Sequence, residues 1–309
     1  MVFNSTRKGY KDYGNREVLM KCRLCKNTAV YEVERFCKDH FIKYYEKKVE
    51  KVVVLSRIKG KRILVPISGG KDSSALAFVL AKYKDEYKID MELLYIHLGI
   101  GSYSDHGLEV SKKLAKQLGI RLNVITMKDN YNTTINDLKD KNEKICSACG
   151  VVKRYLMNKF AFENNFDFVA TGHNLDDEAA FIMHNIFTQN IDQLNRTGMV
   201  TKTIKENKLI GRVKPLYYLT EKENILYCLL NNVTFYNEEC VNAHGNQQLK
   251  NKEILYNLTN SRDKKLSIVK SINKLKINAD VEEWVPSYCT KCGYPTTKGI
   301  CKFCRTIAG

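Results

Sequence analysis

The sequence predicts an α/β fold in which helices cover both faces of a parallel sheet. Short apolar runs of strand length alternate with helical patterns through the middle of the chain, as parallel sheets require. The first apolar run leads through a Gly-Gly turn directly into the first helix. Cysteine groups lie before and after this region, so we expect N- and C-terminal zinc-binding modules to flank it.

The predicted elements repeat as strand, turn and helix, which is a Rossmann-like order. Strands are predicted over residues 63–67, 93–98, 121–127 and 166–171. Helices are predicted over residues 72–83, 109–118, 151–162 and 176–187. Thr220-x-x-Glu223 is a capping box that opens a further helix ending near Leu230. Residues 247–277 have the composition of a Lys-rich helix and contain no recognisable chemical motif.

A chain of 309 residues has room for one large domain and small satellites. We expect four segments along it. These are an N-terminal zinc-binding module (1–50), a catalytic domain (51–245), a helical Lys-rich segment (246–285) and a C-terminal zinc ribbon (286–309).

The composition favours a polyanionic partner. The formal net charge is +17, and Lys or Arg side chains that meet phosphates release condensed counterions. The N-terminus is polar, and no run approaches the ~18 apolar residues that a membrane span needs. We therefore expect a cytoplasmic protein that binds nucleic acid and no membrane.

A glycine-rich loop between the first strand and the first helix is suited to phosphate. It consists of Ser68, Gly69, Gly70, Lys71, Asp72 and Ser73. Glycines let the backbone approach the ligand, and the free N–H groups at the helix start favour anionic oxygens. The spacing matches neither the Walker pattern nor the dinucleotide fingerprint. The loop is therefore predicted to hold a nucleotide phosphate by another arrangement.

A second polar loop follows the fourth strand and should lie at the same sheet edge. It contains Gly172, His173, Asp176 and Asp177, so we predict that it completes the nucleotide-phosphate site. Two carboxylates at a helix start can simply cap N–H groups. They can also hold Mg²⁺ against phosphate oxygens or move a proton. We favour the functional interpretation.

Two cysteine groups have the spacing of closed tetrahedral zinc sites. The first consists of Cys22, Cys25, Cys37 and His40, and the second of Cys289, Cys292, Cys301 and Cys304. Closed sites of this kind are structural, although such knots often present basic residues to nucleic acid.

Cys146 and Cys149 form a third pair with no second pair nearby, at the start of a predicted helix. A helix N-terminus should lower the pKa of these thiols. Three roles compete: a dithiol that carries a persulfide, part of a third zinc site, or an iron–sulfur cluster completed by Cys240. Three ligands to a [4Fe-4S] cluster would leave one iron open to bind sulfide.

The order of these motifs along the chain resembles that of one family. The motifs are the N-terminal zinc knot, the glycine-rich loop, the cysteine pair, the GHNLDD loop, the later cysteine and the C-terminal zinc ribbon. The sequence is similar to the PP-loop ATPases of the adenine nucleotide alpha hydrolase type, and among them to the tRNA 2-thiouridine synthetases. The resemblance runs from Cys22 to Cys304.

The resemblance implies a [4Fe-4S] cluster on Cys146, Cys149 and Cys240, with ATP and Mg²⁺ at residues 68–73. It implies Lys153 and Asp177 as catalytic groups. It also implies tRNA as substrate, a homodimer in common with many members, and sulfide or a thiocarboxylated ubiquitin-like carrier as sulfur donor.

The expected reaction adenylylates the C2 oxygen of a tRNA uridine and replaces it with sulfur. The wobble uridine is favoured over the T-loop position. Three alternatives stay open: a persulfide on Cys149 or Cys240 without a cluster, 2-thiocytidine synthesis, and a non-catalytic zinc-ribbon protein that binds RNA.

Overall fold

A computed structural model describes residues 20–138, 145–195, 197–243, 247–275 and 287–308. The chain divides into two compact units, Met1–Lys43 and Tyr44–Gly309. The predicted segment boundaries at 245/246 and 285/286 lie outside the described residues, and all four predicted segments stay predictions.

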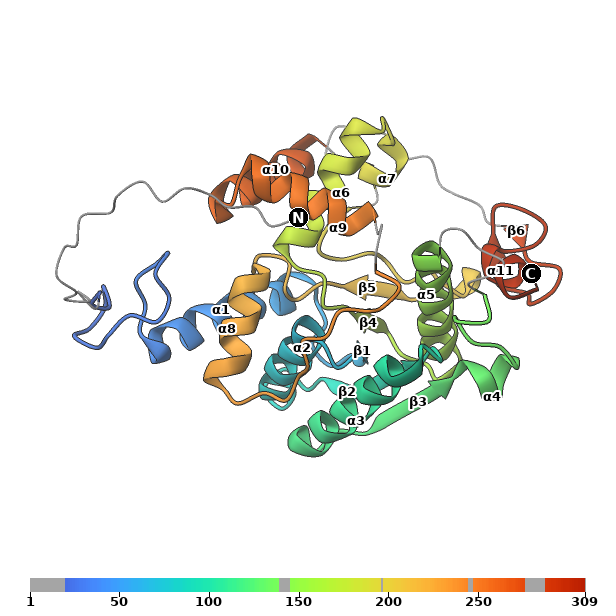
Figure 1. Ribbon diagram of the computed structural model, residues 1–309, viewed down its shortest axis with the longest axis horizontal. Helices are drawn as coiled ribbons and strands as arrows, with labels where there is room; N and C mark the ends of the chain where they lie inside the picture. Colours follow the sequence, from blue (N-terminus) through green and yellow to red (C-terminus); the bar gives the residue numbers. More distant parts are fainter. Residues whose placement is uncertain (1–19, 139–144, 196, 244–246, 276–286, 309) are drawn as a thin grey trace, which may run out of the picture. The chain divides into compact units, whose positions relative to one another are not determined.

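A five-stranded parallel sheet forms the centre of the second unit (Figure 1). Its strand order is β3-β2-β1-β4-β5. Strands β2 and β3 are added on one side of β1 and strands β4 and β5 on the other, so the order of the strands reverses between β1 and β4. The strands are β1 (Arg62–Ile67), β2 (Asp90–His97), β3 (Leu122–Thr126), β4 (Phe168–Ala170) and β5 (Gly211–Val213). This arrangement confirms the predicted parallel α/β fold, with a fifth strand that the sequence pattern did not reveal.

Helices pack on both faces of the sheet and extend beyond it. The helices of the sheet region are α2 (Lys71–Tyr83), α3 (Gly101–Leu118), α4 (Met127–Tyr131), α5 (Ile145–Glu163), α6 (Leu175–Phe187), α7 (Ile191–Asn195), the 3₁₀ turn η1 (Lys205–Asn207) and α8 (Glu221–Leu230). The remaining helices are α1 (Lys38–Leu55), α9 (Gln247–Leu258), α10 (Arg262–Leu275) and α11 (Lys302–Ala308). Within the described residues, no helix combines the length and the apolar character that crossing a bilayer would require.

The centre of the sheet is buried because β1 carries apolar residues on both faces. Ile63, Leu64 and Val65 are fully buried, as expected for a strand covered by helices on either side. Helix α2 contacts β1, α3 contacts β2 and β3, and α5 contacts β2 and β4. Strands β1 and β4 are paired and parallel, so their carboxyl ends lie beside each other, where both polar loops begin.

Several helices differ from the predicted ranges, among them α5, which begins at Ile145 and not at residue 151. Helix α3 begins at Gly101, before its predicted start, because the Ser104 hydroxyl accepts the Ile100 N–H and supports a first turn of poor helix formers. The Lys-rich stretch forms two helices, because the Thr259 hydroxyl accepts the Ser261 N–H in a turn between them. Residues 276–277 of the predicted stretch lie outside the described residues. Helices α1, α4, α7 and α11 are not among the predicted helices.

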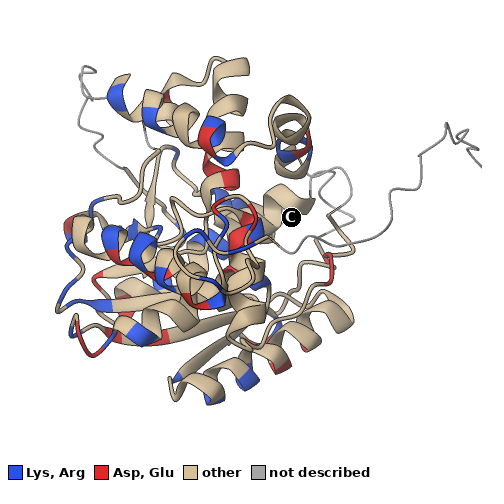
Figure 2. Cartoon of the chain, turned by 90° about the vertical axis from the view of Figure 1, so that its left-hand side faces the viewer, with Lys and Arg blue, Asp and Glu red and all other residues tan. Residues whose placement is uncertain are grey.

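The helices α9 and α10 lie beside α6, which follows the second polar loop (Figure 1). The C-terminal module consists of the hairpin β6 (Ser287–Tyr288) and β7 (Pro295–Thr296) with α11, and α11 packs on α5. Lys and Arg residues are spread over many elements of the chain, and Asp and Glu residues lie among them (Figure 2).

Candidate active site

The glycine-rich loop at the end of β1 is held in place by its own hydroxyls and by a distant segment. The Ser73 hydroxyl donates to the Gly70 carbonyl at 3.0 Å and accepts the Ser68 N–H at 3.2 Å. Gly69 has φ +82°, and a Cβ there would lie 3.0 Å from the Tyr236 ring. The Tyr236 N–H donates to the Gly69 carbonyl at 2.9 Å. The backbone at Gly69 can therefore be formed only by glycine without strain.

The second polar loop packs directly against the first. A Cβ at Gly172 would lie 3.1 Å from the backbone of both Asp72 and Ser73. The Asn174 amide donates to Asp72 at 3.2 Å, while its oxygen accepts the N–H groups of Asp176 and Asp177 at the start of α6. The expected proximity of the two loops is thus present in the structure.

A cavity of about 370 Å³ lies between the two loops and the end of β2. Its walls include Ser68, Asp72, Ser73, Gly172, His173 and Asp177. Lys153 and Met157 of α5 also line it, together with Tyr103 of α3. The two residues predicted to be catalytic, Lys153 and Asp177, therefore share one cavity with the glycine-rich loop. Such a concave site with convergent polar groups suits a small-molecule ligand.

Groups of alternating charge lie at the glycine-rich loop beside this cavity. Burial opposes the charge on Lys71, but Asp72 at 3.1 Å and Glu221 at 3.6 Å raise its pKa. Burial raises the pKa of Asp72, although Lys71 and Asn224 favour its ionised form. Burial lowers the pKa of His173 to about 4, so this ring is neutral at pH 7. The site therefore holds at least one permanent cation beside neutral hydrogen-bonding groups.

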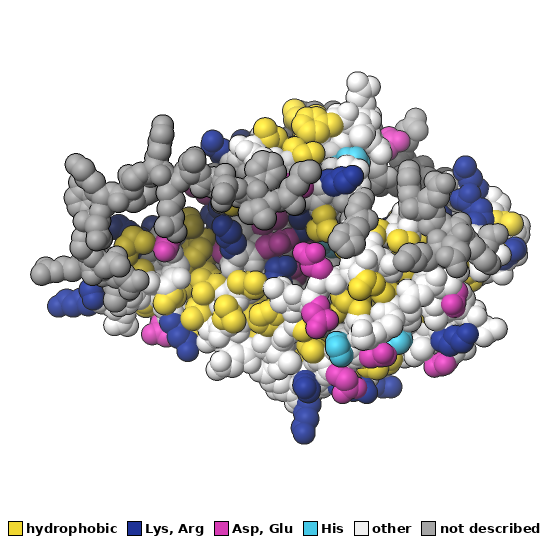
Figure 3. Space-filling view, viewed as in Figure 1, with side chains coloured by type: hydrophobic (Ala, Val, Ile, Leu, Met, Phe, Trp, Pro, Cys, Tyr) yellow, Lys and Arg dark blue, Asp and Glu magenta, His cyan; other side chains and the backbone are white. Residues whose placement is uncertain are grey.

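Two lysines that sequence reasoning missed reach the second loop from the Lys-rich helices. Lys252 of α9 forms an ion pair with Asp177 at 2.5 Å, and Lys265 of α10 forms one with Asp176. Asp176 also accepts the Glu221 N–H at 2.8 Å. No local motif in α9 or α10 signals these contacts. Acidic and basic side chains lie together in a hollow near the middle of the face that Figure 3 shows.

Cys146 and Cys149 lie at the start of α5, which lines the cavity, and Cys240 lies close to both. Cys149 and Cys240 pack against the same apolar cluster, and the Cys146 thiol donates to the Asn242 carbonyl at 2.9 Å. After burial, the nearby Cys240 thiol also raises the pKa of both Cys146 and Cys149, as only a neighbouring group does. The predicted lowering of the pKa at Cys146 and Cys149 is wrong. Burial raises the pKa of both thiols, and nearby Lys153 offsets only part of that effect.

The two terminal cysteine groups each bring four ligand atoms within 4.8 Å of one another. In the first unit these atoms belong to Cys22, Cys25, Cys37 and His40, and at the C-terminus to Cys289, Cys292, Cys301 and Cys304. Burial opposes ionisation of Cys289, but the N–H groups of Cys301 and Cys292 lower its pKa to about 6. Four soft ligands at this spacing can hold a metal ion.

Comparison with known proteins assigns this architecture. Residues 37–250 match the PP-loop domain family. The chain is 37% identical over 295 residues to the tRNA-5-methyluridine(54) 2-sulfurtransferase of Pyrococcus horikoshii, which covers 93% of each protein. The chain belongs to the PP-loop tRNA 2-thiolation family. The tRNA-5-methyluridine(54) 2-sulfurtransferase of Thermus thermophilus is 38% identical over 296 residues, covering 93% of this chain and 90% of that protein.

Other members of the PP-loop tRNA 2-thiolation family are also similar. The cytoplasmic tRNA 2-thiolation protein 1 of Arabidopsis thaliana is 30% identical over 286 residues, covering 90% of this chain and 79% of that protein. The solved structure of the U34-tRNA thiolase NcsA from Methanococcus maripaludis with its [4Fe-4S] cluster superposes with a TM-score of 0.79 at 28% identity. It covers 94% of this chain and 96% of that chain. The predicted family and the predicted sulfurtransferase class are confirmed.

Proposed function

We propose that this chain uses ATP to replace the C2 oxygen of a tRNA uridine with sulfur. One observation carries the proposal: Lys153 and Asp177 line the same cavity as the glycine-rich loop. The helix that supplies Lys153 also carries Cys146 and Cys149. This placement supports a two-step substitution in which phosphate binding and sulfur chemistry share one edge of the sheet.

In the first step the uridine C2 oxygen attacks the α-phosphorus of ATP, and the bond to pyrophosphate breaks. Lys71 and the N–H groups at the start of α2 would stabilise the charge on the departing pyrophosphate. Adenylylation converts the C2 oxygen from a poor leaving group into part of AMP. The neutral His173 would donate or accept a hydrogen bond beside the phosphates without adding charge.

In the second step sulfide attacks C2, the C–O bond breaks, and AMP leaves with the oxygen. No net electron transfer is needed, and a proton is released. A [4Fe-4S] cluster on Cys146, Cys149 and Cys240 would supply an iron at which inorganic sulfur is held beside the base. Lys153 would orient the base, since it lines the cavity about one turn of helix beyond Cys149.

The residues present fit both kinds of metal group. Cys149 and Cys240 come from two segments and pack against one apolar cluster, which limits the access of water to a bound iron–sulfur group, and Cys146 lies in α5 three residues before Cys149. The two four-ligand groups are closed by protein atoms and are suited to structural zinc. We propose Mg²⁺ with ATP at the carboxylates of the site. The persulfide route on Cys149 or Cys240 differs in requiring no iron.

The modified position is proposed from the relatives. Those named for 5-methyluridine 54 are 34–38% identical, whereas the U34-tRNA thiolase NcsA is 28% identical. We therefore place the T-loop position 54 first. The wobble position stays a prediction that the likeness to NcsA supports. We also propose that the sulfur donor is free sulfide or a thiocarboxylated ubiquitin-like carrier. We further propose that the protein forms a homodimer and is located in the cytoplasm.

Anaerobic reconstitution tests this function. The purified protein, unmodified tRNA, Mg²⁺, ATP and sulfide should yield AMP, pyrophosphate and 2-thiouridine or its 5-methyl derivative, mapped by mass spectrometry of nuclease fragments. Cys146→Ala should keep nucleotide binding and lose thiolation, and iron analysis separates the cluster from the persulfide route. Full thiolation by Cys146→Ala would remove the cluster from the reaction, and absence of tRNA-stimulated pyrophosphate release would favour a non-catalytic RNA-binding protein.

A further inference from the structure

One carboxylate bridges a lysine of the glycine-rich loop and a lysine of α9. Glu221 is the first residue of α8, and one of its carboxylate oxygens lies 3.6 Å from the Lys71 ammonium. The other oxygen forms an ion pair with Lys252 of α9. An anionic group therefore already occupies the space between a loop lysine and a lysine from the Lys-rich helices. The two cations are close enough for Lys252 to reduce the proton affinity of Lys71.

These groups form a continuous row of alternating charges. The order is Asp72, Lys71, Glu221, Lys252 and Asp177, with 3.1 Å between the first pair and 2.5 Å between the last. The side chains of Lys71, Glu221 and Lys252 are 22%, 32% and 23% exposed, so an incoming anion can reach them. Asp72 and Asp177 at the two ends of the row line the cavity.

We infer that Lys252 of α9 is a second lysine that binds pyrophosphate, in addition to Lys71. Until a nucleotide binds, the Glu221 carboxylate occupies the position between the two lysines that a phosphate would take. A phosphate group presents oxygens at a spacing similar to that of a carboxylate, so it can replace Glu221 between Lys71 and Lys252. The carboxylates released from the lysines are hard oxygen ligands, which Mg²⁺ prefers. Helices α9 and α10, which carried no motif, thereby become part of the nucleotide site. This inference rests on the proposed ATP-dependent function.

Binding of inorganic pyrophosphate in the presence of Mg²⁺ tests this role by calorimetry. Lys252→Met should weaken binding by about 10- to 100-fold, the usual effect of losing a charge-assisted hydrogen bond. Lys252→Arg should recover most of the affinity. Lys250→Met is the matched control, because Lys250 lies exposed on the same helix, and it should bind within twofold of the wild type.

Glu221→Gln provides a change of opposite sign. It removes the competing carboxylate charge, so pyrophosphate should bind more tightly than to the wild type. Hydrogen exchange of the wild-type protein adds a measurement that needs no variant, since residues 247–258 should gain protection when pyrophosphate binds.

The outcomes separate this inference from the proposed function. If the wild type binds neither ATP nor pyrophosphate, the ATP-dependent function itself fails. If the wild type binds pyrophosphate while Lys252→Met binds within twofold of it and α9 gains no protection, the role of Lys252 is wrong. If Glu221→Gln binds no more tightly, displacement of Glu221 is wrong.

Discussion

At the scale of single residues, the ionised state of Asp177 limits the catalytic roles that this carboxylate can have. One carboxylate oxygen pairs with Lys252, and the other accepts the Asn174 N–H at 3.0 Å. Burial opposes its charge, but Lys252 and His173 lower its pKa below the ordinary value of 3.8. A carboxylate of such low pKa is a poor proton acceptor at pH 7. We therefore assign Asp177 an electrostatic role rather than that of a general base.

Asp177→Asn tests this state through the pH dependence of stability. At pH 7 it should lower the free energy of unfolding by about 1–3 kcal/mol, because Lys252 loses one of two carboxylate partners in a largely buried group and keeps the other, Glu221. The pKa of Asp177 is depressed in the folded protein, so its contribution is complete above pH 3.8 and is lost as pH falls through the folded value. Urea unfolding from pH 7 to 3 should show the two proteins converging only below about pH 4. A constant difference down to pH 3 would contradict the assignment.

A substitution of Lys153 should reduce thiolation without reducing pyrophosphate binding. Lys153 lines the cavity but forms none of the ion pairs of the glycine-rich loop that the structure describes. Lys153→Met should lower single-turnover thiolation by about 100-fold or more, the scale of a lost catalytic group. Pyrophosphate affinity should stay within about threefold of the wild type. Lys159→Met, on the same helix but outside the cavity lining, should retain thiolation, and equal losses in both variants would exclude a specific role for Lys153.

At the scale of elements, the glycine-rich loop depends on a close backbone approach that a second glycine does not share. Gly69 and Gly60 both have positive φ, +82° and +69°. A Cβ at Gly69 would lie 3.0 Å from Tyr236 and 3.1 Å from the Gly107 carbonyl, whereas a Cβ at Gly60 would meet nothing within 4 Å. The two positions therefore share backbone strain and differ in packing.

Gly69→Ala should consequently cost more than Gly60→Ala. We expect the control to lose about 1 kcal/mol of stability from backbone strain alone. Gly69→Ala should lose about 2–3 kcal/mol, since the Tyr236 segment must also shift. It should weaken pyrophosphate binding by about tenfold, while Gly60→Ala leaves binding unchanged. Equal effects on unfolding and binding would show that the contact with Tyr236 is unimportant.

Local signals explain which elements could be predicted. The apolar run at residues 63–67, the Gly-Gly turn and the helix after it are consistent with one another over a short stretch, so the first strand and loop were predicted correctly. Strand β5 has three residues and begins at Gly211, which is too short a pattern to recognise. Helix α3 was placed too late because Gly101 and three residues after it are weak helix formers.

The part of the candidate site that could not be predicted depends on distant contacts. Lys265 and Asp176 are 89 residues apart in sequence, and nothing in the composition of α10 identifies a partner. The raised pKa of Cys146 and Cys149 has the same origin, because burial is set by packing and not by position in a helix. Motifs identify the groups that carry chemistry, and the tertiary fold decides their electrostatic state.

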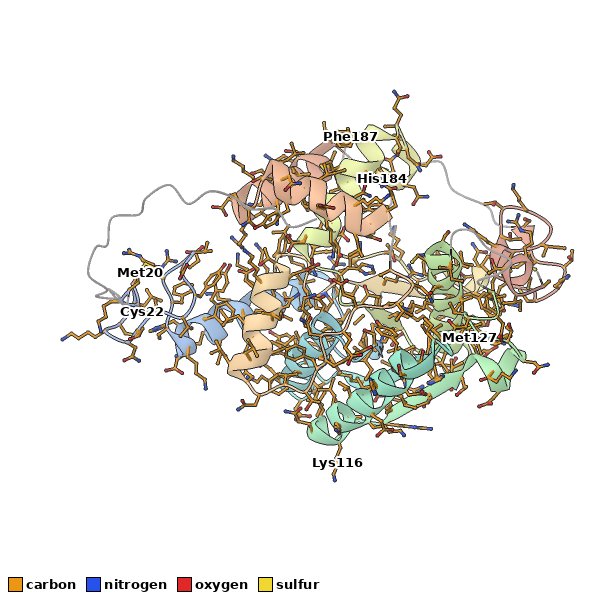
Figure 4. The ribbon with its side chains drawn as sticks, in the orientation of Figure 1. Met20, Cys22, Lys116, Met127, His184 and Phe187 are labelled. Carbon is orange, nitrogen blue, oxygen red and sulfur yellow. The ribbon has the colours of Figure 1, made fainter. Side chains whose placement is uncertain are left out.

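At the scale of the whole molecule, the C-terminal module and the cavity share one apolar cluster within the second unit. Phe303 of α11 stacks on Tyr155 of α5 with ring centroids 3.7 Å apart. The same cluster contains Met127, which Figure 4 labels, and Leu98 at the cavity wall. The helix that carries Cys146, Cys149 and Lys153 is therefore packed between the cavity and the C-terminal cysteine group.

This packing predicts that the C-terminal module maintains the geometry of α5. Phe303 is 3% exposed, so Phe303→Ala should lower the free energy of unfolding by about 3–5 kcal/mol. Phe187→Ala is the matched control, because Phe187 at the end of α6 is 66% exposed (Figure 4) and should change stability by less than about 0.5 kcal/mol. Hydrogen exchange should then increase over residues 145–163 in Phe303→Ala and stay unchanged there in Phe187→Ala. If exchange in α5 is unaffected while α11 loses protection, the C-terminal module is an independent knot and does not support the helix that presents the thiols.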